Sequence, residues 1–162
     1  WARDTKIAYA TINARVETVA EKPAFRGAWR AHRRALVPAT GWYEWKAVGT
    51  LKQPYYVSAS DGNPQMLGAL WERWLDPQGA ELHSCAIITV PVRPELAAVH
   101  DRMPLVLAPT QWAGWLDPKL PQVPAVLEAA ALPYTFTTVA RTVNSVRNDG
   151  PELVRPLFGL AQ

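Results

Sequence analysis

The order of the expected secondary-structure elements limits the fold of this chain more than any other feature. From Ala35 onwards, short β-type runs follow one another at residues 35–39, 42–46, 54–60, 66–72 and 82–90. Turn signals such as Ser60-Asp61-Gly62-Asn63 and Asp76-Pro77-Gln78-Gly79 separate them. Helical patterns follow at 109–116 and 123–131, and a last strand pattern at 134–140. Without the strand–helix alternation of a doubly wound fold, we expect an α+β class with a mainly antiparallel or mixed, barrel-like sheet and peripheral helices.

The part of the chain before Ala35 is expected to contain an extended segment and a helix. Residues 7–20 form the extended segment, and Pro23 fits the first turn of the helix. Phe25 and Trp29 share one helical face. Arginines recur at the same spacing on another face, namely Arg26, Arg30 and Arg34. This basic face is either simply solvated, which we favour, or in contact with nucleic acid.

Composition indicates one domain that comprises residues 1–162. A chain of 162 residues, 49% of them hydrophobic, can bury a core, and no repeat or linker divides it. No apolar run approaches the roughly 20 residues of a membrane helix, and a lone cysteine suits a reducing compartment. We therefore expect a soluble monomer in the cytoplasm. The chain opens at Trp1 without a methionine, so its native start is expected to be absent.

The charged and aromatic residues favour a phosphate-bearing partner. The net charge is only +3, but the bases are mostly arginine, whose planar fork of donors fits phosphate. A solvated basic surface is the alternative. The chain also holds eight tryptophans and fifteen prolines, which indicates a loop-rich fold with flat apolar surfaces that can stack on bases.

A candidate acid–base group lies in the run Gly41-Trp42-Tyr43-Glu44-Trp45. Strand alternation places Glu44 on the same face as Trp42, with Tyr43 and Trp45 on the other face. A carboxylate beside an indole in a partly apolar pocket should have a raised pKa, which suits a general acid or base. The alternative is a strand-edge glutamate paired with an arginine.

Two further polar segments supply an amide, an imidazole and two guanidinium groups. Asn13 and Arg15 alternate onto one face of the extended segment, so both can point into one cleft. His100 follows an apolar element and can carry protons near neutral pH, although a structural role is the alternative. Arg102, two residues later, offers a contact for an anion.

The remaining candidates are weaker. The polar loop at 141–150 either holds itself in place, which we slightly favour, or presents Arg147 and Asn148 to a ligand. Cys85 shares a strand face with Thr89, but its neighbours are of the core type, so we expect a buried structural cysteine. The three histidines have no partner at ligand spacing, and Cys85 has no second thiol. We therefore expect no metal and no other cofactor.

Taken in order, the motifs of the chain resemble those of the SRAP family (SOS response-associated peptidase), and the resemblance extends from Trp1 nearly to Phe158. The segments that carry it are Ile12-Asn13-Ala14-Arg15-Val16-Glu17-Thr18, Gly41-Trp42-Tyr43-Glu44-Trp45, Lys52-Gln53-Pro54-Tyr55, Ile87-Ile88-Thr89, His100-Asp101-Arg102-Met103-Pro104 and Val146-Arg147-Asn148-Asp149. Each motif is modest, but their joint order makes coincidence improbable.

The resemblance implies a compact α+β domain that binds single-stranded DNA at abasic sites in the DNA-damage response. In such proteins the cysteine after the initiator methionine becomes the N-terminus. Its α-amine and thiol close a thiazolidine with the sugar aldehyde, which crosslinks protein and DNA. The family is alternatively described as a thiol autopeptidase. A non-catalytic module for single-stranded DNA is the third possibility.

The resemblance also implies roles for individual residues. Asn13 would orient the cysteine and sugar, Glu44 would move protons, and His100 would assist ring opening and reversal. The residues expected to contact DNA are Trp1, Arg15, Thr89, Arg102 and Arg147. The N-terminal portion that carries the catalytic cysteine is not in this chain, so the chain as given is expected to be inactive. Either the sequence is truncated, which we favour because Asn13, Glu44 and His100 are retained, or the protein is a degenerate member of the family. A nucleoid-associated location follows from the same resemblance.

Overall fold

The computed structural model describes residues 5–119, 130 and 132–157. The chain folds into two compact units, each assembled from three separate stretches of sequence. The first unit comprises Trp1–Pro38, Met66–Pro91 and Arg102–Ala130, and the second comprises Ala39–Gln65, Val92–Asp101 and Ala131–Gln162. The expectation of one domain over the whole chain stays a prediction.

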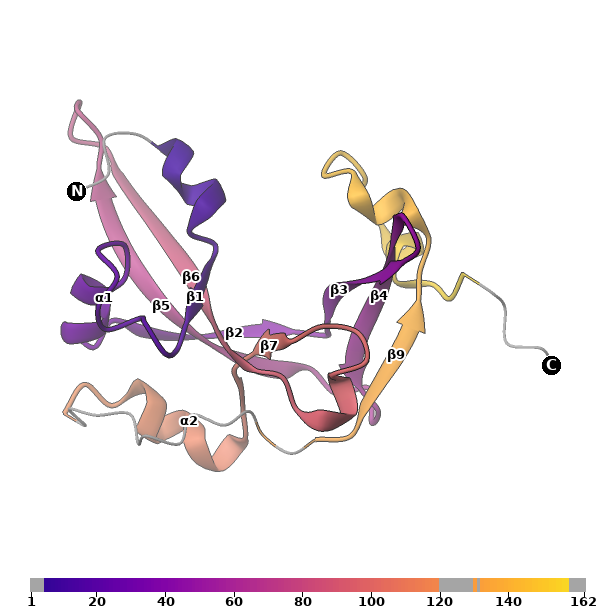
Figure 1. Ribbon diagram of the computed structural model, residues 1–162. Helices are drawn as coiled ribbons and strands as arrows, with labels where there is room; N and C mark the ends of the chain where they lie inside the picture. Colours follow the sequence, from indigo (N-terminus) through magenta and orange to yellow (C-terminus); the bar gives the residue numbers. More distant parts are fainter. Residues whose placement is uncertain (1–4, 120–129, 131, 158–162) are drawn as a thin grey trace. The chain divides into compact units, whose positions relative to one another are not determined.

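The first unit is built on a mixed sheet in which the strand order is β1-β6-β5-β2 (Figure 1). β7 pairs with β6 and β8 pairs with β5, both antiparallel, whereas β1 and β6 run parallel. The strands are β1 (Asn13–Arg15), β2 (Arg34–Ala39), β5 (Gln65–Leu75), β6 (Glu81–Pro91), β7 (Arg102–Pro104) and β8 (Val106–Leu107). The helices are the 3-10 helix η1 (Thr5–Ala10), α1 (Arg26–Arg30) and α2 (Pro109–Leu116).

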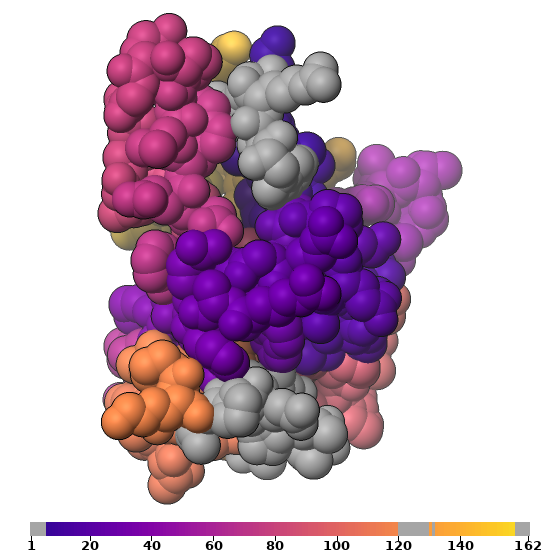
Figure 2. Space-filling model, turned by 90° about the vertical axis from the view of Figure 1, so that its left-hand side faces the viewer, coloured from indigo at the N-terminus to yellow at the C-terminus, as the bar shows by residue number. Residues whose placement is uncertain are grey.

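Alternation along β6 shows how the sheet builds its core. Ala86, Ile88 and Val90 are buried, while Ile87 and Thr89 on the other face are partly accessible. β1 adds Ala14, which is fully buried opposite Ile88. In Figure 2 the violet segment around α1 covers the middle of the face shown, beside the pink β5–β6 hairpin.

The second unit contains a three-stranded antiparallel sheet of order β3-β4-β9. Its strands are β3 (Trp42–Val48), β4 (Leu51–Ala59) and β9 (Tyr134–Thr138), and its 3-10 helices are η2 (Pro94–Leu96), η3 (Arg141–Asn144) and η4 (Pro151–Val154). Val57, Leu96, Val139 and Leu153 are buried in this unit. These features confirm the predicted α+β class with a mixed, mainly antiparallel sheet.

Most expected elements are confirmed, including the helix at Pro109–Leu116 and every expected strand from Ala35 onwards. Both quoted turns are present: Gly62 has φ 74° and Gly79 has φ 86°. The expected helix at 123–131 lies almost wholly outside the described residues. Within the described part, no helix is long and apolar enough to cross a membrane.

Four expectations were wrong. Of the expected extended segment 7–20, residues 7–10 belong to the 3-10 helix η1, only Asn13–Arg15 form a strand, and residues 16–20 form a turn. The helix α1 begins at Arg26, so Pro23 lies in the turn before the helix and not in its first turn. Arg34 does not extend the basic helical face, because it lies in β2, is only 7% exposed and stacks its guanidinium over Trp29 and Trp115. Cys85 is exposed rather than buried. It lies outside the stretch of β6 that pairs with β1, Ile87–Thr89.

Candidate functional site

The predicted site residues divide between the two units, and each group has its own geometry. Asn13, Arg15, Thr89 and Arg102 belong to the first unit. Glu44, His100 and Arg147 belong to the second. Trp1 lies outside the described residues.

In the first unit, three of the predicted residues share one face of the β1–β6 pair. Asn13 lies opposite Ile87 and Arg15 lies opposite Thr89 in the parallel register. The predicted alternation is confirmed, because Asn13 and Arg15 are exposed while Ala14 between them is fully buried. The main-chain N–H of Val16 donates to the Thr89 carbonyl oxygen at 3.0 Å and fixes the end of β1 against β6. An amide, a hydroxyl and a guanidinium group therefore project from one rigid strand pair.

Arg102 is bound by a carboxylate of the same unit, which the sequence did not reveal. Both its terminal nitrogens donate to Glu17, with Nη2 3.0 Å from Oε2, and Nη2 also donates to the Thr89 carbonyl oxygen at 2.6 Å. The hydrogen bonds from Arg102, with the nearby charge of Arg15, hold the pKa of Glu17 below its usual value. A bidentate pair of this kind fixes the guanidinium in position. Arg102 therefore ties the turn after β1 to β7, and its contact with DNA stays a prediction.

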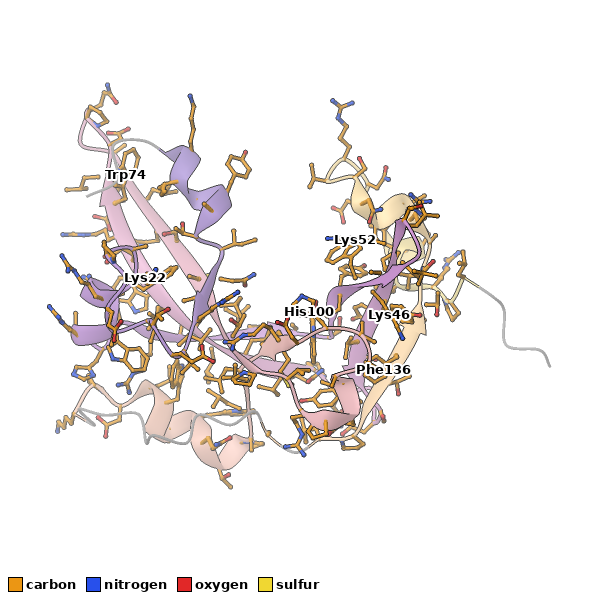
Figure 3. The ribbon with its side chains drawn as sticks, in the orientation of Figure 1. Lys22, Lys46, Lys52, Trp74, His100 and Phe136 are labelled. Carbon is orange, nitrogen blue, oxygen red and sulfur yellow. The ribbon has the colours of Figure 1, made fainter. Side chains whose placement is uncertain are left out.

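In the second unit, Glu44 and His100 form a pair. Glu44 projects from β3, where it lies opposite Tyr55 of β4. His100 follows η2, and Figure 3 labels it on that loop. The Nδ1 atom of His100 lies 3.6 Å from Oε2 of Glu44 and 3.3 Å from Oδ1 of Asp101. The partner of Glu44 is thus a histidine and not the arginine of the alternative interpretation.

The Glu44 carboxyl group is held in a partly desolvated position. Its side chain is 18% exposed, whereas that of His100 is 41% exposed. Burial raises the pKa of Glu44, and this outweighs the opposing effects of His100 and of the Trp42 indole; Asp101 raises it further. The predicted raised pKa is therefore confirmed. A carboxyl group whose pKa is moved toward neutrality, beside an accessible imidazole, can exchange protons with a substrate.

Two aromatic residues form an apolar wall near this carboxyl group. Trp42 and Tyr134 meet edge to face, with ring centroids 5.5 Å apart. Burial raises the pKa of Tyr134 to about 12, which shows how poorly solvated this wall is. The Nε1 of Trp42 is buried without a hydrogen-bond partner of standard length among the described residues, so its effect on Glu44 acts over a longer distance.

The loop that carries Arg147 is held by its own polar side chains. Nδ2 of Asn148 donates to the Thr142 carbonyl oxygen at 2.6 Å. Nε1 of Trp45 donates to Oδ1 of Asn144 at 2.8 Å and connects the loop to β3. The side chain of Arg147 is exposed on this loop. Asn148 thus has the structural role that we favoured, while Arg147 remains accessible to a ligand.

Sequence reasoning missed Glu17 and Asp101 as members of these two groups. The alternation that placed Asn13 and Arg15 on one face also includes Glu17, so the sequence did carry a signal for Glu17.

A separate apolar groove of about 340 Å³ in the first unit is lined by residues of η1, α1, β5 and β6, including Cys85. Of the predicted DNA-binding and catalytic residues that the structure describes, none lines this groove.

Comparisons with known proteins place this arrangement in a family. The model of the family described as "SOS response associated peptidase (SRAP)" matches residues 1–146. The chain is 37% identical over 160 residues to the abasic site processing protein YoqW of Bacillus subtilis, covering 95% of this chain and 70% of that protein. It is 34% identical to the abasic site processing protein YedK of Escherichia coli, covering 90% and 67% of the two chains.

The chain is also similar to an animal protein and to a solved structure. The abasic site processing protein HMCES of Gallus gallus is 31% identical, with coverage of 94% of this chain and 52% of that protein. A crystal structure from Bacteroides thetaiotaomicron superimposes with a TM-score of 0.80 at 28% identity, covering 98% of this chain and 72% of the other. The family match spans the strand pair that bears Asn13 and Arg15 as well as the Glu44–His100 pair. With more than half of its length matched by the family model, the chain belongs to the SRAP family.

Proposed function

We propose that this chain is part of an SRAP protein that binds abasic sites in single-stranded DNA and crosslinks to them in the DNA-damage response. The observation that supports this most is the pairing of a partly buried Glu44 with the accessible His100. Relatives that share the family and are named abasic site processing proteins support the same function.

The proposed reaction joins an N-terminal cysteine, supplied by the portion of an SRAP protein that precedes this sequence, to the open-chain aldehyde of the abasic sugar. Its α-amine adds to the aldehyde carbon, and loss of water gives an imine. The thiol sulfur then adds to the imine carbon, and its proton moves to the nitrogen, which closes a thiazolidine. Each step moves a proton on or off oxygen, nitrogen or sulfur, so it needs a group that both donates and accepts protons.

Three residues are proposed to serve this chemistry. The raised pKa of Glu44 suits it to protonate the departing hydroxyl group, which leaves as water, and to accept the thiol proton. His100, whose Nδ1 atom lies 3.6 Å from Oε2 of Glu44 and 3.3 Å from Oδ1 of Asp101, is proposed to assist ring opening and reversal. Asn13 would orient the cysteine and the sugar through its exposed amide.

Binding of the DNA backbone is proposed for Arg15, Thr89 and Arg102 in the first unit and for Arg147 in the second. Arg15 and Arg147 are exposed cations that can neutralise phosphates. Arg102 is already paired with Glu17, so we propose that it acts on DNA mainly by fixing the face that carries Arg15 and Thr89.

The proposal is tested by mixing the protein, extended at its N-terminus by the cysteine-bearing portion of an SRAP protein, with single-stranded DNA that holds one abasic site. A heat-stable adduct on a denaturing gel is expected, and replacing the N-terminal cysteine by alanine should abolish it. Absence of an adduct with the cysteine present would refute the covalent function.

A peptidase activity is the second candidate, because the family model bears that description. It predicts that the expressed protein removes its own initiator methionine and cleaves unrelated peptides. Intact-mass measurement of a Glu44→Gln variant checks the first part, since loss of self-processing would favour the peptidase and normal processing would argue against it.

A further inference from the structure

A pocket of about 370 Å³ lies beside Asn13 and Arg15 in the first unit. It is bounded by η1, by β1 and by the turn that leads into α1, and Figure 3 labels Lys22 on that turn. Its volume is at the lower end of the range for small-ligand sites, which run from roughly 300 to 1,000 Å³. The pocket therefore has room for a single unit of a polymer rather than for a long stretch.

The lining of this pocket is apolar on one side and cationic on the other. Ile7, Pro23 and the half-buried ring of Phe25 provide apolar surface. Arg15 and Lys22 provide two positive charges, and none of the described residues that line the pocket is a carboxylate. A flat apolar wall with adjacent cations is the combination by which proteins hold single-stranded nucleic acids, where a base stacks and a phosphate is neutralised.

Both cations are fixed to the same short stretch of backbone. The N–H of Thr18 donates to the Arg15 carbonyl oxygen at 3.1 Å, and the N–H of Lys22 donates to the Thr18 carbonyl oxygen at 3.0 Å. The Lys22 carbonyl oxygen in turn accepts from Phe25 at 3.0 Å and from Arg26 at 2.9 Å. The turn thus holds the main chain of Lys22 at a set position relative to the main chain of Arg15 and of Phe25.

Neither Arg15 nor Lys22 forms an ion pair with another residue in the described part of the chain. The ion pairs between described residues involve other basic groups, such as Arg33, Arg93 and Arg102. Both side chains are exposed. Their charges therefore remain available to an anion that enters the pocket.

We propose that this pocket binds the nucleotide next to the abasic position, with Lys22 and Arg15 on its phosphate and Phe25 against its base. The inference rests on the proposed function, since it places an intact nucleotide beside the residues expected at the lesion. It adds Lys22 and Phe25 to the DNA-binding residues, and it explains why the turn after β1 carries a lysine and an aromatic ring seven and ten residues after Arg15.

The test measures the affinity of the 162-residue chain for a fluorescent single strand by anisotropy. The strand carries a central tetrahydrofuran, an abasic analogue that has no aldehyde and so cannot crosslink. Lys22→Ala should weaken binding about three- to tenfold at moderate salt, because one phosphate contact is lost. The slope of log K against log salt should become shallower by about 0.7, the value for one phosphate on a single strand.

Two further variants make the result specific. Phe25→Leu keeps an apolar side chain of similar bulk but removes the stacking surface, and it should weaken binding at least fivefold with little change in the salt slope. Lys119→Ala removes the same charge from an exposed position of the first unit that does not line the pocket, and its affinity should stay within twofold of the wild type. Circular dichroism checks that all three variants are folded.

Equal affinities for Lys22→Ala and Lys119→Ala, or a wild-type affinity for Phe25→Leu, would overturn the proposal. These outcomes are distinct from failure of the covalent function. If the variants bind as expected but the cysteine-extended protein forms no adduct with natural abasic DNA, the pocket stands and the crosslinking function falls. If the adduct forms while Lys22 and Phe25 make no difference, the pocket is not the nucleotide site.

Discussion

Gly41 begins the motif that carries Glu44, and the structure leaves no space there for a side chain. A Cβ at this position would overlap the Val57 carbonyl oxygen and would lie 2.5 Å from Cζ of the Tyr56 ring. Neither group can move away easily. Val57 is paired with Trp42 in the β3–β4 register, and the Tyr56 hydroxyl is hydrogen-bonded to Thr40 at 2.8 Å.

We therefore expect Gly41→Ala to be strongly destabilising. Overpacking of a well-packed site costs about 1–3 kcal/mol, and we expect the upper end, about 3 kcal/mol, because the main chain and a held ring both obstruct the new methyl group. For a chain of this size, each kcal/mol lowers Tm by about 2–4 °C, so Tm should fall by about 6–12 °C. Urea unfolding followed by tryptophan fluorescence and a thermal scan measure the two quantities.

Gly27→Ala is the matched control, because it adds the same methyl group where there is room. The nearest atoms to a Cβ at Gly27 are 3.9 Å away, and the residue lies inside α1. Alanine there should raise the free energy of unfolding by about 0.5–1 kcal/mol. A Gly41→Ala variant within about 0.5 kcal/mol of the wild type would refute the close approach of β3 to β4 on which the position of Glu44 depends.

Three further predictions concern single side chains. Because burial raises the pKa of Glu44 above its ordinary 4.5, the folded state binds the proton of this carboxyl group more tightly than the unfolded state, and this stabilisation is complete below pH 4.5 and is lost as pH rises through the raised pKa. Glu44→Gln should therefore be more stable relative to wild type at pH 7 than at pH 4. Urea unfolding that gives the same difference in stability at both pH values would contradict this. Trp45→Phe and Asn144→Ala each remove the same hydrogen bond, so each should cost about 0.5–1.5 kcal/mol and the double variant less than their sum; full additivity in the unfolding cycle would argue against the bond. The exposed Cys85 should react with DTNB in the native protein with one thiol per chain, whereas reaction only in urea would show it to be buried.

Local sequence patterns predicted the strands, because the start of a strand and the faces of its side chains depend on residues close together in the sequence. Alternation and turn residues determine where a strand starts and which face a side chain occupies, and this was enough to place Glu44 with Trp42 and Asn13 with Arg15. Pairing between distant segments leaves no such mark. The parallel contact of β1 with β6 joins Asn13–Arg15 to a strand far along the chain, so the sequence pattern did not indicate it.

The wrong expectations have the same origin. The arginine spacing that suggested a helix through Arg34 stops at Arg30, because His32 adopts φ 53°, a left-handed conformation that no neighbouring residue signals. Cys85 has core-type neighbours in the sequence, but its burial depends on what packs against its face of the sheet, which the sequence pattern does not show. Likewise, the pairing of Arg102 with Glu17 joins residues 85 positions apart and could be seen only in three dimensions.

Proton transfer by Glu44 is the central claim, and the rate of adduct formation tests it most directly. The protein extended by the cysteine-bearing portion is mixed with abasic single-stranded DNA, and wild type is compared with Glu44→Gln, which keeps the size and polarity of the side chain. Affinity for the unreactive tetrahydrofuran strand should be unchanged, while the rate of adduct formation should fall by about 10²- to 10⁴-fold, the usual contribution of a general acid–base group. An unchanged rate would contradict the assignment of Glu44 as the group that moves protons.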